Sequence, residues 1–378
     1  MSHKLSFLLI SILLSTYFAS AQKTYLFVGS YNENKDSSGI YVYRFDPANG
    51  QLQPVTTAKG MLNPSYLTIS EDGNYIYTAA QSKKKDDGRI GSYVFDRKNG
   101  SVGFINEQSS GGANPVYVTG HKNGQWLVNG NYSGSSISVF PLNDGGSVGA
   151  AKQVIPFVDS SVMKSRQKQS HIHAVFFSPD FRYIFSPDLG ADKIRGYRFD
   201  EQQDEPLRTT DRPFTRTAPG SGPRHMAFHP NGKYVYSIEE MSGTVTAYKY
   251  AADKLDSIQT ITAHVAEGVT DYGSADIHFS PDGRFLYATT RGKENLIFTY
   301  SVNARNGRIK LIGSEGTGGN HPRNFVIDPT GKFLLVANMI SGNVVVFERN
   351  MKTGKLRKTG TELTMKGPSC LKFREYAD

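Results

Sequence analysis

The chain has 378 residues, of which 38% are hydrophobic and 20% are charged, and its formal net charge is +9. Its one cysteine, Cys370, can form no internal disulfide, which excludes a small disulfide-stapled secreted domain. Much of the positive charge lies in runs such as residues 83–85 and 164–168. We interpret these runs as solvated loops rather than as a nucleic-acid-binding surface.

The first 21 residues are predicted to be a cleaved secretory signal. Lys4 supplies a basic start, residues 5–18 are largely apolar, and Ala19-Ser20-Ala21 is a small-residue cleavage site. The apolar run is too short for a comfortable membrane span, and polar sequence follows at once. We therefore expect a periplasmic or secreted mature chain, with residues 22–378 as one domain that has no membrane contact after cleavage.

A hairpin signature recurs along this mature chain. Each copy is a β-rich run, a turn such as Ser280-Pro281-Asp282-Gly283, and then a second run that is rich in aromatic residues. Proline and Asp or Asn start a tight turn, and glycine supplies the positive φ that the turn requires. The glycine or its replacement stands at positions 73, 124, 181, 232, 283 and 331, with spacings of 51, 57, 51, 51 and 48 residues. Four strands in about 50 residues predict a propeller blade.

The two ends of the chain supply the remaining blade. Residues 367–373 match residues 63–69, the first strand of a blade, but the chain ends before a hairpin partner follows. Residues 24–30 and 39–45 have the pattern of a second and a third strand. The sequence therefore predicts an all-β, seven-bladed β-propeller with four antiparallel strands per blade. Its last blade is closed by the N-terminal strands, which leaves no open sheet edge between the first and last blades.

Aligned blades point to one rim of the central channel as a candidate site. The innermost strand of each propeller blade lines the channel, so we compared the residues where inner strands begin and second strands end. Arginines there can grip a carboxylate or phosphate, and histidine or glutamate can move a proton. A purely structural pairing of arginine with glutamate is the alternative. The residues concerned are His173, Arg224, Glu240, Arg291 and Arg323.

Four further polar residues are predicted to contact the substrate from the same rim: His171, Asp188, Asn131 and Asn338. His171 and His173 form an H-x-H pair that could hold a metal, but the sequence indicates no third ligand. We therefore expect no metal and no cofactor. The nucleotide-binding G-x-G-x-x-G, the P-loop and the G-x-S-x-G elbow find no support in the sequence.

The chain resembles the seven-bladed propeller lactonase family, which includes bacterial 6-phosphogluconolactonases and the fungal carboxymuconate-lactonizing enzyme. The resemblance spans essentially the whole mature chain. It implies that His173, Arg224, Arg291 and Glu240 are the catalytic residues of a metal-independent reaction, with Glu240 or His173 directing water. The matching segments include His171-Ile172-His173, Asp188-Leu189-Gly190-Ala191-Asp192, Gly222-Pro223-Arg224-His225, Arg291-Gly292 and Pro322-Arg323-Asn324-Phe325.

The chain departs from the family pattern at Ser170, where proline is usual, and at Glu239 and Thr290, where asparagine is usual. Adjacent carboxylates at Glu239 and Glu240 could raise the pKa of one of them. We expect an exported, monomeric lactonase that hydrolyses a sugar lactone, such as gluconolactone or a related anionic lactone, and binds no nucleic acid. The alternatives are a non-catalytic periplasmic binding or scaffold propeller, and a muconate-type cycloisomerase that closes an unsaturated diacid.

Overall fold

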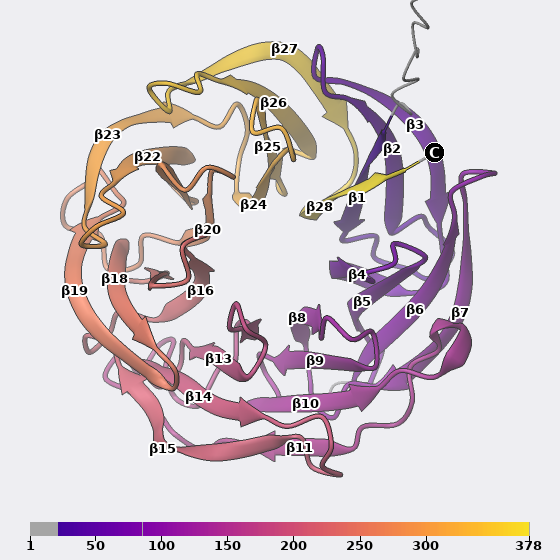
Figure 1. The fold of residues 1–378 in the computed structure, drawn as a ribbon, viewed down its shortest axis with the longest axis horizontal. Helices are drawn as coiled ribbons and strands as arrows, with labels where there is room; N and C mark the ends of the chain where they lie inside the picture. The colour runs from indigo at the N-terminus through magenta and orange to yellow at the C-terminus, as the bar shows by residue number, and fades with distance from the viewer. Residues whose placement is uncertain (1–21, 85, 378) are drawn as a thin grey trace, which may run out of the picture.

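The computed structural model describes residues 22–84 and 86–377, so the predicted signal at residues 1–21 lies outside the described residues. Seven four-stranded antiparallel sheets surround a central axis in this part of the chain (Figure 1). The predicted seven-bladed propeller is therefore confirmed. Within the same residues, no helix has the length and apolar character needed to cross a membrane.

In each blade the innermost strand lines the channel and three further strands follow outward. Six blades are each formed by one continuous stretch of chain. The first consists of β4 (Leu62–Ile69), β5 (Tyr75–Gln81), β6 (Gly88–Asp96) and β7 (Ser101–Ser109), and the second of β8 (Pro115–Gly120), β9 (Trp126–Asn131), β10 (Ser136–Pro141) and β11 (Gln153–Pro156). The third consists of β12 (Phe176–Phe177), β13 (Tyr183–Asp188), β14 (Lys193–Phe199) and β15 (Leu207–Arg216). The fourth blade consists of β16 (Pro223–Phe228), β17 (Tyr234–Glu239), β18 (Thr244–Ala251) and β19 (Lys254–Thr262). The fifth consists of β20 (Ser274–Phe279), β21 (Phe285–Thr290), β22 (Leu296–Val302) and β23 (Ile309–Gly316). The sixth consists of β24 (Pro322–Ile327), β25 (Phe333–Asn338), β26 (Asn343–Arg349) and β27 (Leu356–Thr364). A short 3-10 helix, η1, spans Asp144–Gly146.

The seventh blade joins the two ends of the chain, as the sequence predicts. Its innermost strand is β28 (Pro368–Tyr376), followed outward by β1 (Lys23–Ser30), β2 (Ile40–Asp46) and β3 (Gln51–Ala58). Strands β28 and β1 are antiparallel, with Leu26 opposite Phe373 and Gly29 opposite Cys370. Cys370 is fully buried at this seam, and burial raises the pKa of its thiol to about 11, so it is an inert core group.

The recurrent turn joins each inner strand to the second strand. Ser280 Oγ donates to Asp282, and the Phe285 amide donates back to Ser280 Oγ at 3.1 Å. Gly283 has φ 68°, which a side chain tolerates poorly. Phe181 takes φ 62° at the equivalent position, where its ring stacks on Phe177 at a centroid distance of 5.3 Å.

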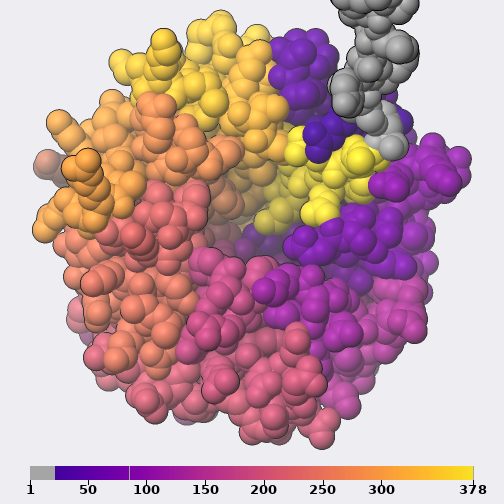
Figure 2. All heavy atoms as spheres, viewed as in Figure 1, coloured from indigo at the N-terminus to yellow at the C-terminus, as the bar shows by residue number. Residues whose placement is uncertain are grey.

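A second repeated contact determines which residues face the opposite end of the channel. In five of the seven blades, the residue that follows the second strand donates its amide hydrogen to the carbonyl of the residue just before the inner strand. Examples are Glu240 to Gly222 at 2.7 Å and Arg291 to Gly273 at 3.1 Å. These residues and the first residues of the inner strands therefore gather at one mouth of the channel, while the recurrent turns lie at the other. The space-filling view shows the centre of the propeller hollowed (Figure 2).

Candidate active site

Glu240 is the centre of a buried ionic cluster at this mouth. Its Oε2 accepts a hydrogen bond from Arg224 Nε at 2.9 Å and lies 2.7 Å from Arg291 Nη2. Its Oε1 accepts from Arg166 Nη2 at 2.6 Å. One carboxylate therefore aligns three guanidiniums that come from β16, from the residue after β21 and from the loop before β12.

The alternation of side chains explains why Glu240, and not its neighbour, enters the cluster. Glu239 ends β17 and turns into the blade, where Thr246 Oγ1 donates to it at 2.9 Å and Thr244 also bonds to it. Burial raises the pKa of Glu239, while the bonds from Thr244 and Thr246 oppose that change. The predicted raised pKa in this pair is therefore found on Glu239, but its cause is burial rather than the charge of Glu240.

Glu240 itself has a lowered pKa. Burial alone would raise it, but the positive charges of Arg291, Arg224 and Arg166 outweigh that penalty. Glu240 is therefore ionised at neutral pH, with both oxygens engaged. Such a carboxylate is a poor general base, because accepting a proton would weaken its ion pairs with the three arginines.

Arg224 and Arg291, two of the three arginines that contact Glu240, are held rigidly. Arg224 is 1% exposed, and its Nη1 donates to the Ala275 carbonyl at 2.5 Å. Burial lowers the pKa of Arg224 to about 9, with further lowering by Arg291 and Arg323, and Glu240 opposes the change. Arg291 Nε donates to the Gly273 carbonyl at 2.7 Å. Guanidiniums fixed in this way are suited to bind an anion without further ordering.

His173 stands beside this cluster as a neutral imidazole. It is 4% exposed, and its Nδ1 is buried without a hydrogen-bond partner. Its ring packs edge-on against Tyr132 at 5.4 Å and against His225 at 5.3 Å between centroids. Burial lowers the pKa of His173 well below its ordinary value, and the charges of Arg224 and Arg323 lower it further. His173 is therefore free to accept a proton at neutral pH.

Arg323 and His171 complete the rim. Arg323, on β24, lies over the Tyr31 ring at 5.9 Å. His171 stacks on Tyr132 with centroids 4.3 Å apart, and its Nδ1 lies 2.9 Å from the Tyr132 carbonyl. The structure thus brings together the predicted set of His173, Arg224, Glu240, Arg291 and Arg323, with His171 two residues from His173.

The other three predicted substrate contacts have structural partners instead. Asp188, Asn131 and Asn338 are each fully buried at the ends of their second strands. Asp188 accepts from Arg195 and from the His171 amide, and Asn131 donates to the Ser110 carbonyl at 3.0 Å. Asn338 donates to the Thr317 carbonyl at 3.1 Å. These residues occupy the same blade position as Glu239, so their side chains point into the blade and tie it to neighbouring loops. In this structure the three side chains bond within the protein, whereas the sequence predicts that they contact the substrate.

Arg166 is the functional residue that sequence reasoning missed. It belongs to the basic run at residues 164–168, for which the sequence predicts a solvated loop. Its side chain is 31% exposed and bonds both Glu240 and Asp271. No blade alignment could find it, because it lies outside the repeated strands. The one available signal is the spacing of 57 residues between markers 124 and 181, which shows that this blade carries extra loop.

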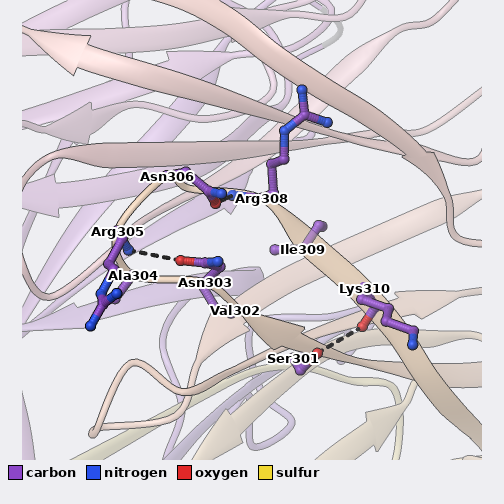
Figure 3. Close-up of a pocket in the computed structure, with 9 residues that line it drawn as sticks. All are labelled: Ser301, Val302, Asn303, Ala304, Arg305, Asn306, Arg308, Ile309 and Lys310. Atoms are coloured by element: carbon purple, nitrogen blue, oxygen red, sulfur yellow. Dashed lines mark hydrogen bonds between the residues drawn. The ribbon is translucent and has the colours of Figure 1, made fainter.

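Other features of the described residues do not resemble this cluster. No group of three or more His, Cys, Asp or Glu side chains there is placed to hold a metal ion. The hollow drawn in Figure 3 lies on the β22–β23 hairpin at the outer part of a blade, between Ser301 and Lys310. Its bonds are local, such as the Arg305 amide to Asn303 at 3.0 Å, and it contains no buried charged group.

Comparison with known proteins identifies the family. Residues 25–373 match the family model "Lactonase, 7-bladed beta-propeller". The chain is 40% identical to a 6-phosphogluconolactonase of Formosa agariphila, over 93% of this chain and 100% of that protein. It is 33% identical to the 6-phosphogluconolactonase of Bacillus subtilis, over 92% and 97% of the two chains. A solved structure of the Pseudomonas aeruginosa periplasmic gluconolactonase PpgL is 35% identical, covers 93% of this chain and 99% of its own, and superposes with a TM-score of 0.88. The chain therefore belongs to the seven-bladed β-propeller lactonase family.

Proposed function

We propose that this chain is an exported lactonase that hydrolyses an anionic sugar lactone of the gluconolactone type. The observation that carries the proposal is a neutral, unpartnered imidazole, His173, beside guanidiniums that Glu240 aligns at the channel mouth. The relatives named 6-phosphogluconolactonase support the reaction class. The signal-like residues 1–21 and the periplasmic Pseudomonas relative support export.

The mechanism that follows from these residues uses His173 as the base. His173 takes a proton from water while the water oxygen attacks the lactone carbonyl carbon. Arg224 and Arg291 stabilise the oxyanion that develops on the carbonyl oxygen. The tetrahedral intermediate collapses, the bond from carbon to ring oxygen breaks, and protonated His173 gives its proton to the leaving oxygen. The product is an open-chain hydroxy acid.

Glu240 acts in this mechanism by holding the arginines rather than by moving a proton. Its lowered pKa and its ion pairs with Arg166, Arg224 and Arg291 oppose its protonation. The sequence alone left Glu240 and His173 open as the group that directs water. The structure favours His173, whose burial keeps it neutral.

The charge of the mouth supports an anionic substrate. Arg166, Arg224, Arg291 and Arg323 supply four positive charges, while Glu240 and Asp271 supply two negative ones. Because the remaining charge is positive, a carboxylate or phosphate on the lactone would be attracted, and Arg can bind either in a bidentate manner. An exported enzyme would meet an unphosphorylated sugar lactone more readily than a cytoplasmic phosphorylated one.

The test is hydrolysis by the purified mature chain. Acid release from glucono-1,5-lactone and from 6-phosphogluconolactone is followed above the spontaneous rate, with a chelator control and beside Arg291→Ala. We expect hydrolysis that survives the chelator and is lost in Arg291→Ala, and the preferred lactone shows whether a phosphate group is recognised. No rate above background on either lactone would overturn sugar-lactone hydrolysis and would favour a binding propeller or a cycloisomerase.

A further inference from the structure

Arg323 differs from the other three arginines of the channel mouth, which all pair with Glu240. Among the residues that the structure describes, no carboxylate lies within ion-pair distance of Arg323. Its half-buried guanidinium lies over the Tyr31 ring, 5.9 Å from the ring centroid. The charge of Arg323 also contributes to the lowered pKa of His173. Arg323 therefore supplies a positive charge beside the proposed base that no described carboxylate neutralises.

His321, two residues earlier in the chain, has a backbone conformation that its residue type does not favour. Its φ is 68°, in the left-handed region, where glycine and asparagine are preferred. The equivalent residue of five other blades also has a positive φ, and each of those residues is glycine or asparagine. They are Asn63, Asn114, Gly222, Gly273 and Gly367, with φ between 48° and 66°. Of these six blades, only the sixth places a ring at this position, which points to a function for that side chain.

Hydrogen bonds fix His321 at the mouth. Its amide donates to Asn295 Oδ1 at 2.7 Å, and its carbonyl accepts from the Met339 amide at 2.9 Å. Asn295 Nδ2 donates in turn to the Gly292 carbonyl at 2.9 Å, next to Arg291. The fifth and sixth blades are therefore joined at the place where Arg291 and His321 meet.

The contact with Arg291 determines which nitrogen of His321 carries the proton. Arg291 Nη1 lies 3.3 Å from His321 Nε2. Because a guanidinium can only donate, Nε2 is the acceptor and the neutral ring carries its proton on Nδ1. Burial, together with the charges of Arg291 and Arg323, lowers the pKa of His321 to about 3, so the ring is neutral at neutral pH. Nδ1 has no hydrogen-bond partner among the described residues, so its N–H is available to a ligand.

One unpaired guanidinium and one neutral N–H donor match a group with a single negative charge. A carboxylate has that charge, and its two oxygens accept the parallel N–H groups of an arginine. A phosphate monoester carries about −1.5 to −2 charges at pH 7, so its second charge would face a neutral ring. The donors at this place therefore favour a carboxylate over a phosphate.

The two residues also lie next to the group that performs the proposed hydrolysis. Arg291 contacts both sets, since its Nη2 lies 2.7 Å from Glu240 and its Nη1 lies 3.3 Å from His321. A lactone whose carbonyl is bound by Arg291 and Arg224 can therefore extend from the fourth and fifth blades toward the sixth.

We propose that Arg323 and His321 form a subsite that binds a carboxylate of the substrate, at the end of the molecule away from the reacting carbonyl. Arg323 binds it through two guanidinium N–H groups, and His321 donates from Nδ1. The Tyr31 ring packs against the guanidinium. The subsite rests on the proposed lactonase function and narrows its substrate to the lactone of a sugar diacid, which keeps one free carboxylate when the other forms the ring.

The test compares two lactones that differ in one carboxylate. Glucaro-1,4-lactone and glucono-1,4-lactone have the same ring, and the first carries a carboxylate where the second carries a hydroxymethyl group. A third lactone, 6-phosphogluconolactone, is the phosphate probe. The variants of the full mature chain are Arg323→Gln and His321→Asn, because asparagine already occupies this backbone position at residues 63 and 114. Arg305→Gln, on the exposed β22–β23 hairpin, is the control for the loss of one positive charge.

We expect the wild type to have a higher kcat/KM for glucaro-1,4-lactone than for glucono-1,4-lactone. Arg323→Gln should lower the value for glucaro-1,4-lactone about 10²-fold and His321→Asn about tenfold, since each removes hydrogen bonds to a charged group. Both variants should keep kcat/KM for glucono-1,4-lactone within about threefold of wild type, because Arg291 retains its contacts with Glu240 and Gly273. Arg305→Gln should match the wild type on both lactones.

The melting temperature separates ligand binding by His321 from a structural role. Asparagine is a preferred residue for the left-handed region, so His321→Asn should melt at the wild-type temperature or above it while the selectivity for the carboxylate falls. A lower melting temperature with the selectivity intact would overturn the role of His321 in the subsite.

The kinetics can also overturn the subsite as a whole. An equal loss on both 1,4-lactones in Arg323→Gln, or the same loss in Arg305→Gln, would show that Arg323 does not recognise the carboxylate. A loss in Arg323→Gln that is confined to 6-phosphogluconolactone would overturn the choice of a carboxylate.

Product binding separates this proposal from the lactonase assignment. Glucarate and gluconate differ by the same carboxylate, and calorimetry should show that the wild type binds glucarate at least about tenfold more tightly. Arg323→Gln should remove that difference. A wild-type chain that hydrolyses no lactone would overturn the proposed function, whereas equal binding of glucarate and gluconate by the wild type would overturn the subsite.

Discussion

The two sides of the channel mouth have the same backbone and different chemistry. At the position that follows the proline of the inner strand, β4, β8 and β28 carry Ser65, Val116 and Ser369, whereas β16 and β24 carry Arg224 and Arg323. Ser369 Oγ donates to the Ser65 carbonyl at 2.8 Å, so these hydroxyls join neighbouring blades. The propeller therefore repeats the same backbone position in each blade, but the arginines lie on one side of the mouth (the charged side) and the serines on the other (the serine side).

Substitutions on the charged side should also cost more free energy of unfolding. Arg224 and Glu240 are nearly inaccessible to solvent, and removal of one partner from a buried pair leaves an uncompensated charge. The serine side contains no such pair at its equivalent positions. Variants on the two sides should therefore differ in both activity and stability.

The largest expected effect on activity comes from His173→Gln. It removes a neutral imidazole that borders the arginine cluster and whose Nδ1 is buried without a hydrogen-bond partner. We expect kcat for lactone hydrolysis to fall about 10²- to 10⁴-fold, because that is the usual contribution of a general base. Steady-state kinetics on the preferred lactone measures it. A loss of less than about tenfold would assign the base to another residue.

The largest expected effect on stability comes from Glu240→Gln. Arg224 would remain buried without its carboxylate, so the free energy of unfolding should fall by about 3–5 kcal/mol. Because the pKa of Glu240 is lowered on folding, its contribution is fully present above the unfolded pKa of about 4.3 and is lost as pH falls through the folded value. Denaturant unfolding at several pH values should show the two proteins converging below about pH 4. A stability difference that does not change with pH would contradict the ionised carboxylate.

Arg166→Ala should have an intermediate effect. The Arg166 side chain is 31% exposed, and the solvent that reaches it screens its pairs with Glu240 and Asp271. We expect a loss of stability of at most about 1 kcal/mol and a rise in KM for an anionic lactone, with kcat changed less. Lys164→Ala is a matched control in the same loop. An equal change in KM in both variants would show that Arg166 acts only through the overall positive charge of its loop.

The smallest effect is expected on the serine side. Ser369→Ala removes one hydroxyl bond between blades and no group that faces the arginine cluster. We expect kcat and KM to stay within about twofold of wild type and the melting temperature to fall slightly. A large loss of kcat in Ser369→Ala would show that the substrate spans the whole mouth.

The fold and the mouth positions could be predicted because the repeat encodes them. Each Pro-Asp-Gly-like turn marks one hairpin, and the seventh blade is complete only if residues 24–30 pair with residues 367–373. Aligned blades then place Arg224, Glu240 and Arg291 together, although 67 residues separate the first from the last in sequence.

The periodicity could not show which of two adjacent side chains faces the channel. Asn131, Asp188 and Asn338 align with Glu239 rather than with Glu240, and strand alternation sends them into the blade. Arg166 lies in an inserted loop that no repeat predicts. The bond from His225 to Asp276 joins two inner strands, and a search within single blades has no means to find it.

In the proposed mechanism His173, and not Glu240, accepts the proton from water. The most direct measurement is the pH dependence of kcat/KM for the wild type, His173→Gln and Glu240→Gln. Because burial lowers the pKa of His173 well below 6.5, wild-type kcat/KM should be flat through neutral pH and fall only in the acid range. The account predicts that this acid limb persists in the residual activity of Glu240→Gln and is absent from that of His173→Gln. An acid limb that disappears in Glu240→Gln and persists in His173→Gln would contradict it.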